Sequence, residues 1–241
     1  MKTYLVGGAV RDEIIGVKSK DLDYTVVFED GDLEGVEDPF TFMVEWFENL
    51  GYNIFVTTPE HFTIRAQTPD RKETADFVLA RREGPYTDGR RPDFVEVGSL
   101  IDDLGRRDFR FNAIAKDAAG FYIDPFNGRA DIDAGIIRAV GDPFMRLNED
   151  ALRAVRAIRF SVTKGFRIAA DLEVAMQNTR VLDSIRTKIS DERIQMELSK
   201  MFRYDTVASL TALKNFPLLT AAMFSGNVSL DATLKTKGRG K

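Results

Sequence analysis

The 241-residue sequence contains no cysteine and only one histidine, His61. The lack of cysteine excludes disulfides, thiolate zinc sites and a cysteine nucleophile, and it is typical of a protein from a reducing, cytoplasmic compartment. A single histidine excludes zinc sites built from histidine clusters and disfavours a histidine-based catalytic triad. Any metal chemistry in this chain must therefore use carboxylate ligands.

Long apolar runs are also missing. No stretch approaches the roughly 18 consecutive apolar residues of a membrane span. The first residues, MKTYLVGGAVRDEII, lack the basic and long apolar regions of a secretory signal. We expect a soluble protein with no membrane partner.

Positive charge is absent from residues 21–64, which contain no lysine or arginine but carry an acidic cluster between Glu29 and Asp38. Basic residues gather instead at 81–91, 106–110 and 146–167 and in the final KTKGRGK, although the formal net charge is −4. Basic patches on an acidic protein favour a localised anionic ligand, either a nucleotide or RNA.

Hydrophobic periodicity predicts an α/β domain over residues 1–142 and a helical domain over 143–241. In the first domain we expect the strands 4–6, 22–28, 53–57, 61–67 and 75–80, the helices 9–15 and 40–50, a loop at 84–94 and hairpins between 120 and 142. In the second we expect a helix from 149 to 164 with Asn148 as its N-cap, followed by helices at 171–179, 190–203 and 205–214.

The stretch KDLDYTVV places Asp21 and Asp23 on one face of a predicted strand, within about 7 Å of each other. Two carboxylates this close repel unless a cation or a basic side chain neutralises them. They are either solvated turn residues or ligands for Mg²⁺, which takes one or two protein carboxylates together with substrate phosphates. A third carboxylate is expected on a neighbouring strand, where Asp76 is best placed and Glu73 is the alternative.

Two further patterns suit a nucleotide. The Gly7–Gly8 turn precedes a predicted helix, so backbone N–H groups can approach a phosphate, and Arg11 can add a charged contact. On the helix expected from 149, Asp150 and Arg153 share a face, with Arg156 next on the same side. The pair is either an exposed salt bridge or a device that reads the Watson–Crick edge of a base.

Five stretches in this order resemble the motifs of the bacterial-type (class II) tRNA nucleotidyltransferase and poly(A) polymerase family. They are GGAVRD with KDLDYTVV, then RRDFRFNAIAKD, the two halves of DPFMRLNEDALRAVRAIRF, and SDERIQMELSKMF. The resemblance covers residues 4–203. It implies an α+β fold, with a polymerase-β-like nucleotidyltransferase head of mixed sheet and flanking helices followed by an all-α neck.

The resemblance also implies residue roles. Gly7, Gly8 and Arg11 would contact nucleotide phosphates, and Asp21 and Asp23 would hold two Mg²⁺ ions. Arg106, Arg107, Asp108 and Asn112 match the second motif, which contacts the nucleotide sugar. Asp150 and Arg153 fall on the pair that selects CTP or ATP without a template, and Ser190, Glu192, Arg193 and Glu197 lie on a bracing helix.

Two positions depart from the family pattern. Arg110 stands where threonine is usual, and Phe62 stands where glycine is common. The chain also stops at 241, whereas family members usually continue into helical regions that grip tRNA. The loop RREGPYTDGRRPDF, which the family ties to switching from C to A addition, is retained.

We therefore expect a metal-dependent enzyme that adds CCA, or part of it, to the 3′ acceptor end of tRNA from CTP and ATP. The alternatives are a poly(A) polymerase or a transferase acting on another RNA and, from a different class, a non-catalytic nucleotide-binding or RNA-binding module.

Overall fold

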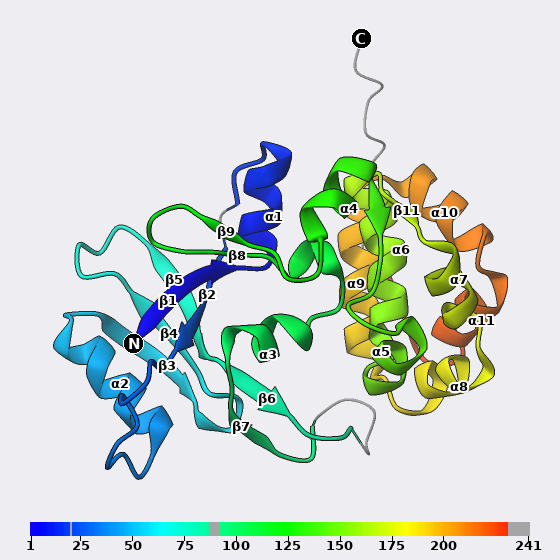
Figure 1. Cartoon of the computed structure of the whole chain (residues 1–241). Coiled ribbons are helices and arrows are strands. Elements are labelled where there is room, and N and C mark those ends of the chain that lie inside the picture. Colours follow the sequence, from blue (N-terminus) through cyan, green and yellow to red (C-terminus); the bar gives the residue numbers. More distant parts are fainter. Residues whose placement is uncertain (20, 87–91, 231–241) are drawn as a thin grey trace. The chain divides into compact units, whose positions relative to one another are not determined.

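The computed structural model describes residues 1–19, 21–86 and 92–230, and it separates into two compact units (Figure 1). The first unit comprises residues 1–84 and 94–132. The second comprises residues 133–241 and 85–93, as far as these are described. The division at 132/133 precedes the boundary expected at 142, and each unit is described separately below.

The first unit is built on a seven-stranded mixed sheet with the order β3-β4-β5-β2-β1-β8-β9. All neighbours are antiparallel except β2 and β5, which run parallel. The strands are β1 (Lys2–Val6), β2 (Leu22–Val27), β3 (Asn53–Thr58), β4 (Thr63–Gln67), β5 (Thr74–Leu79), β8 (Ala115–Lys116) and β9 (Tyr122–Ile123). The fold class expected from the resemblance, a mixed sheet with flanking helices, is confirmed.

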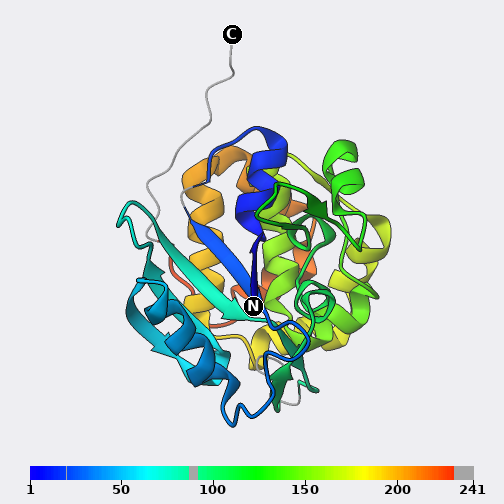
Figure 2. The same cartoon turned by 60° about the vertical axis from the view of Figure 1, so that its left-hand side comes forward.

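Alternation along the strands gives the sheet one apolar and one polar face. Val26, Ile64 and Phe77 point to the first face, where they pack with Phe40 and Phe47 of helix α2 (Pro39–Asn49). Helix α2 lies along this side of the sheet in both views (Figures 1 and 2). The opposite face carries the polar residues of the same strands, because successive side chains alternate.

Four shorter elements and one hairpin complete the first unit. These are α1 (Gly8–Ile15), α3 (Leu100–Gly105), the 3₁₀ turns η1 (Pro59–His61) and η2 (Arg110–Asn112), and the pair β6 (Arg81–Glu83) and β7 (Val95–Val97). The predicted loop 84–94 lies between β6 and β7, and residues 87–91 of it are outside the described residues.

The prediction of hairpins throughout 120–142 is wrong in part. Only β8 and β9 form a hairpin, whereas residues Gly128–Ala134 form helix α4. The Asp124 carboxylate caps this helix by accepting hydrogen bonds from the backbone N–H groups of Gly128 (2.7 Å) and Arg129 (2.9 Å). A Cβ at position 128 would lie 2.1 Å from the Arg110 carbonyl oxygen, so only glycine fits there. Gly128, which lies in the region where hairpins were expected, is therefore the first residue of a helix.

The second unit is helical, with a small parallel pair of β10 (Ile136–Ile137) and β11 (Arg167–Ile168). Its helices are α5 (Pro143–Glu149), α6 (Leu152–Lys164), α7 (Ala170–Met176), α8 (Thr179–Thr187), α9 (Asp191–Tyr204), α10 (Thr206–Lys214) and α11 (Pro217–Met223). None of the helices within the described residues is both long and apolar enough to cross a membrane.

One helix boundary in this unit differs from the prediction. Asn148 is not an N-cap, because it lies inside α5, which is capped by Asp142 and starts at Pro143. The backbone is extended at Asp150 (φ −148°) and separates α5 from α6. Asp150 thus sits at a break between two helices and not within one.

Candidate active site

Two strands bring carboxylates together on the polar face of the sheet. Asp23 on β2 is directly opposite Asp76 on the parallel strand β5, and Asp21 lies one residue before β2 begins. Glu73, the alternative third carboxylate, lines a cavity with Tyr24 and Phe77, which point to the other face. The strand register therefore places Asp76, and not Glu73, on the face of the sheet that carries Asp23.

The electrostatics of these carboxylates show that negative charge is concentrated here. Burial raises the pKa of Asp23, nearby Arg107 opposes this, and the carboxylates of Asp76 and Asp21 raise the pKa further. Arg65 on β4 forms an ion pair with Asp76, with 2.8 Å between Nε and Oδ1. Within the described part of the chain, no three acidic or histidine side chains are grouped so as to hold a metal ion by themselves.

The Gly7–Gly8 turn leads directly into the N-terminus of α1. Gly7 has φ +71°, which favours glycine, and it caps α1 without a side-chain hydrogen bond. A Cβ on Gly7 would lie 2.8 Å from Nη1 of Arg107. The turn therefore brings the positive end of a helix and a guanidinium group to one place, which suits an anion.

Three residues predicted to bind nucleotide form a buried hydrogen-bonded chain. Arg11 donates from Nη1 to Oδ1 of Asn112 (2.7 Å), and Asn112 donates from Nδ2 to Oδ1 of Asp108 (3.0 Å). All three side chains are less than a tenth exposed. The chain links α1 to η2 and so fixes the Gly7–Gly8 turn against the second motif.

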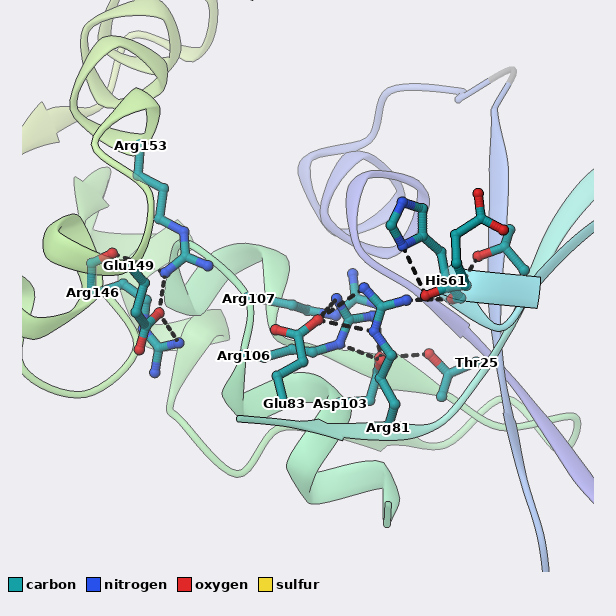
Figure 3. A network of polar contacts seen from close by, with 12 residues as sticks. Thr25, His61, Arg81, Glu83, Asp103, Arg106, Arg107, Arg146, Glu149 and Arg153 are labelled. Atoms are coloured by element: carbon teal, nitrogen blue, oxygen red, sulfur yellow. Dashed lines mark hydrogen bonds and ion pairs between the residues drawn. The ribbon is translucent and has the colours of Figure 1, made fainter. Parts of the chain in front are cut away.

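A buried acid that the sequence analysis did not single out organises the two arginines of the second motif. Asp103 on α3 is completely buried and accepts hydrogen bonds from Thr25 of β2 (2.7 Å), from Arg106 (2.6 and 2.9 Å) and from Arg107 (3.0 Å) (Figure 3). Although burial works in the opposite direction, the two guanidinium groups and the Thr25 hydroxyl lower its pKa to about 2. The only signal in the sequence is an acid placed three and four residues before two arginines.

In the second unit, Asp150 and Arg153 are held by other partners. Asp150 accepts hydrogen bonds from Arg193 of α9 at 2.6 and 3.3 Å and from the backbone N–H of Leu152 at 3.1 Å. Arg153 is buried and donates from Nη1 to Glu149 (2.6 Å) and to the Arg146 carbonyl (2.9 Å), as part of the group drawn in Figure 3. The two side chains are thus fixed separately at the α5–α6 break.

Arg156, which was predicted to follow Asp150 and Arg153 on the same side, forms an ion pair with Glu197 of α9, with 3.7 Å between Nη1 and Oε1. Arg159 also pairs with this buried glutamate. Arg193 and Glu197 belong to the fifth motif. The contacts show that this motif connects α9 to α6 and to the break at Asp150.

Comparison with known proteins identifies the family. The model of the poly A polymerase head domain family matches residues 3–138. The chain belongs to this family. A CCA-adding enzyme of Leuconostoc mesenteroides is 37% identical over 201 residues, which is 83% of this chain and 45% of that protein.

Solved structures of CCA-adding enzymes and a tRNA nucleotidyltransferase are also similar to this chain. The CCA-adding enzyme of Bacillus stearothermophilus in complex with CTP is 33% identical, has a TM-score of 0.70, and is matched over 88% of this chain and 47% of that one. A tRNA nucleotidyltransferase complexed with a primer tRNA and an incoming ATP analog is 26% identical with a TM-score of 0.71, over 93% of this chain and 60% of that one. The chain spans about half the length of the curated relatives it matches.

The residues of this poly A polymerase head domain fit the Mg²⁺ ions implied by the resemblance. Asp21, Asp23 and Asp76 offer the hard oxygen ligands that Mg²⁺ requires, and the pKa of Asp23 is raised first by burial and then by the carboxylates of Asp76 and Asp21, whose charge a cation would neutralise. The metal needs only one or two of them, since substrate phosphates supply further ligands.

Proposed function

We propose that this chain is a template-independent tRNA nucleotidyltransferase that adds CCA, or part of it, to tRNA 3′ ends in the cytoplasm. The observation that carries the proposal is the placement of Asp23 beside Asp76 on the sheet face whose adjoining Gly7–Gly8 turn and Arg107 suit a triphosphate. Its support from relatives is the similarity to CCA-adding enzymes, one of them in complex with CTP.

In the proposed reaction the terminal 3′-hydroxyl of the RNA attacks the α-phosphate of CTP or ATP. A P–O bond forms to the RNA, the bond to the β-phosphate breaks, and pyrophosphate leaves while the hydroxyl proton passes to solvent or a carboxylate. Mg²⁺, when bound, would activate the hydroxyl and neutralise the developing charge. Asp21, Asp23 and Asp76 would hold it, and the Gly7–Gly8 turn and Arg107 would hold the β- and γ-phosphates.

Base selection would belong to Asp150 and Arg153. A carboxylate accepts from an exocyclic amino group, while a guanidinium donates to a ring nitrogen or carbonyl oxygen, so the pair can read the Watson–Crick edge of C or A, whereas U has no amino group to donate. Their attachment to Arg193 and Glu149 supports this proposal, because fixed side chains can act as a template.

The test is incorporation of labelled CTP and ATP into tRNA transcripts, read at single-nucleotide resolution, for the wild-type chain and for Asp21→Ala. We expect Asp21→Ala to reduce incorporation by at least 100-fold. The matched control is Asp70→Asn, an exposed acid in a turn that pairs with Lys72, and it should retain wild-type incorporation. Wild-type incorporation by Asp21→Ala would refute the proposal.

A second candidate, a poly(A) polymerase, is favoured by the description of the matching family model. It has the same chemistry, so only the products separate the two. Long A tails on a tRNA that ends in CC would support the polymerase, whereas addition of one A and then a stop would support CCA addition. A non-catalytic module would bind nucleotide and release no pyrophosphate.

A further inference from the structure

The buried Asp103 carboxylate is a junction of hydrogen bonds from three residues of the first unit. Its side chain is fully buried, and its two oxygens accept from Thr25, Arg106 and Arg107, which lie on β2 and in the segment after α3. Thr25 is two residues beyond Asp23 and on the same face of β2. One carboxylate thus connects the strand that carries Asp23 to two guanidinium groups.

Only part of the Arg107 guanidinium is occupied by this contact. Nη2 donates to Asp103 at 3.0 Å, whereas Nη1 faces Gly7, whose added Cβ would lie 2.8 Å away. Nε of Arg107 is buried and has no hydrogen-bond partner among the described residues. A buried donor without a partner destabilises the protein, and a catalytic role or a bound water or ion accounts for such groups in many native structures.

The groups around the Arg107 donors favour binding of an anion. Arg107 is close enough to Asp23 to oppose the rise in the pKa of that carboxyl that burial causes, and the N-terminus of α1 begins at Gly8, next to Gly7. A guanidinium donates in a fixed planar fork that matches phosphate oxygens. Its orientation is set by whatever holds its other edge, and in this structure that is Asp103.

We infer that Asp103 is a positioning residue for the nucleotide triphosphate. By binding one edge of Arg107, it directs the other donors toward the phosphates at the Gly7–Gly8 turn, and through Thr25 it keeps them in register with Asp23. The inference rests on the proposed function for the identity of the ligand as a triphosphate.

A purely structural role for Asp103 makes a different prediction. If Asp103 only stabilises the core, its replacement lowers the melting temperature, and any loss of binding is independent of Arg107. If Asp103 acts through Arg107, replacing it in a chain that already lacks Arg107 has no further effect on triphosphate binding.

The experiment measures the dissociation constants of CTP and of inorganic triphosphate with Mg²⁺ by titration calorimetry, without tRNA. We expect Asp103→Asn and Arg107→Gln each to weaken binding of both probes at least tenfold. The double variant should bind within twofold of Arg107→Gln alone. The control is Asp102→Asn, the neighbouring acid that caps α3 through Ser99 and should leave both dissociation constants within twofold of wild type.

Asp103→Glu provides a second variant if Asp103→Asn does not fold. It keeps the charge but moves the carboxylate, and it should weaken triphosphate binding while circular dichroism shows a folded chain. Wild-type affinity in a folded Asp103 variant, or multiplied losses in the double variant, would overturn the inference, as would a wild-type chain that binds neither probe. If the wild-type chain binds CTP as expected but extends no tRNA, the proposed function fails and the positioning role stands.

Discussion

At the scale of single residues, the candidate site carries charge that works against folding. Asp23 is partly buried beside two other carboxylates, and its raised pKa means that the ionised form is disfavoured in the folded state. For an acid with a raised folded pKa, stability is lost as pH rises through that value, so the ionised Asp23 costs stability at pH 7.

Asp23→Asn should therefore raise the melting temperature in EDTA while it abolishes nucleotide incorporation. The free energy of unfolding should increase by about 0.5–2 kcal/mol, which is the common range for a single charge-optimising substitution. Thermal unfolding with and without Mg²⁺ tests this, since Mg²⁺ should stabilise the wild-type chain and leave the variant unchanged. A variant less stable than wild type in EDTA would contradict it.

Phe62 has a backbone conformation that disfavours residues with a Cβ, and it stands where the family commonly has glycine. Its φ of +54° is left-handed, which costs a residue with a Cβ roughly 1–2 kcal/mol. Its ring stacks with Phe40 at 6.4 Å between centroids, and its carbonyl accepts from the Leu79 N–H (2.9 Å). Packing and this hydrogen bond hold the strained backbone in place.

Substitution at Phe62 should reverse the usual order of alanine and glycine. Both changes remove the ring, but only glycine also removes the strain, so Phe62→Gly should be more stable than Phe62→Ala by about 1 kcal/mol. Urea unfolding of the two variants measures the difference. Equal stability, or a more stable alanine variant, would show that the backbone relaxes at this position.

The buried Asp103 makes a pH-dependent contribution of known sign. Its pKa is lowered from 3.8 to about 2, so its stabilisation is present above about pH 4 and is lost as pH falls toward 2. The difference in unfolding free energy between wild type and Asp103→Asn should shrink by on the order of 2 kcal/mol between pH 5 and pH 2. Denaturant titrations at several pH values test this, and a difference independent of pH would contradict the assignment.

At the scale of elements, ion pairs between acids and arginines fix helix α9 to α6 and to the break that precedes α6. Asp150 pairs with Arg193 at 2.6 Å, and the buried Glu197 pairs with Arg156 and Arg159. Glu197→Gln leaves the arginines without their counter-charge and should destabilise the fold by about 3 kcal/mol in urea unfolding. Asp183→Asn, an exposed acid paired with Arg186 on α8, should cost less than about 1 kcal/mol. Similar effects of the two changes would contradict the proposed brace.

The elements show which features of a sequence determine structure locally. The five longer strands β1–β5 and six helices were predicted, because periodicity and the glycine stops at Gly16 and Gly165 are local signals, whereas the short helices α3, α5, α8 and α11 were not predicted. Helix α4 and the break at Asp150 were missed. The first depends on capping by Asp124 and on close approach to Arg110, and the second on the extended backbone between α5 and α6.

The candidate site likewise contains some residues that could be predicted from the local sequence and others that could not. The Asp21/Asp23 pair and the Gly7–Gly8 turn could be recognised because each lies within a few residues of sequence. Asp103 could not, since its tie to the strand that carries Asp23 is a hydrogen bond from Thr25, which lies 78 residues away. Likewise, Asp150 is 43 residues from Arg193, and spacing along one helix suggested Arg153 as its neighbour instead.

At the scale of the whole molecule, the chain combines a head with a candidate metal and phosphate site and a helical unit with a fixed candidate base-reading pair. It spans about half the length of its curated relatives. We expect these two units to carry out nucleotide transfer to RNA.

The most direct test incubates the purified chain with Mg²⁺, CTP, ATP and tRNA transcripts that end before CCA, after CC and after CCA. We expect extension of the first two up to CCA, no extension of the third, and no reaction in EDTA. Failure to extend any transcript, in a chain that is folded and binds CTP, would contradict it.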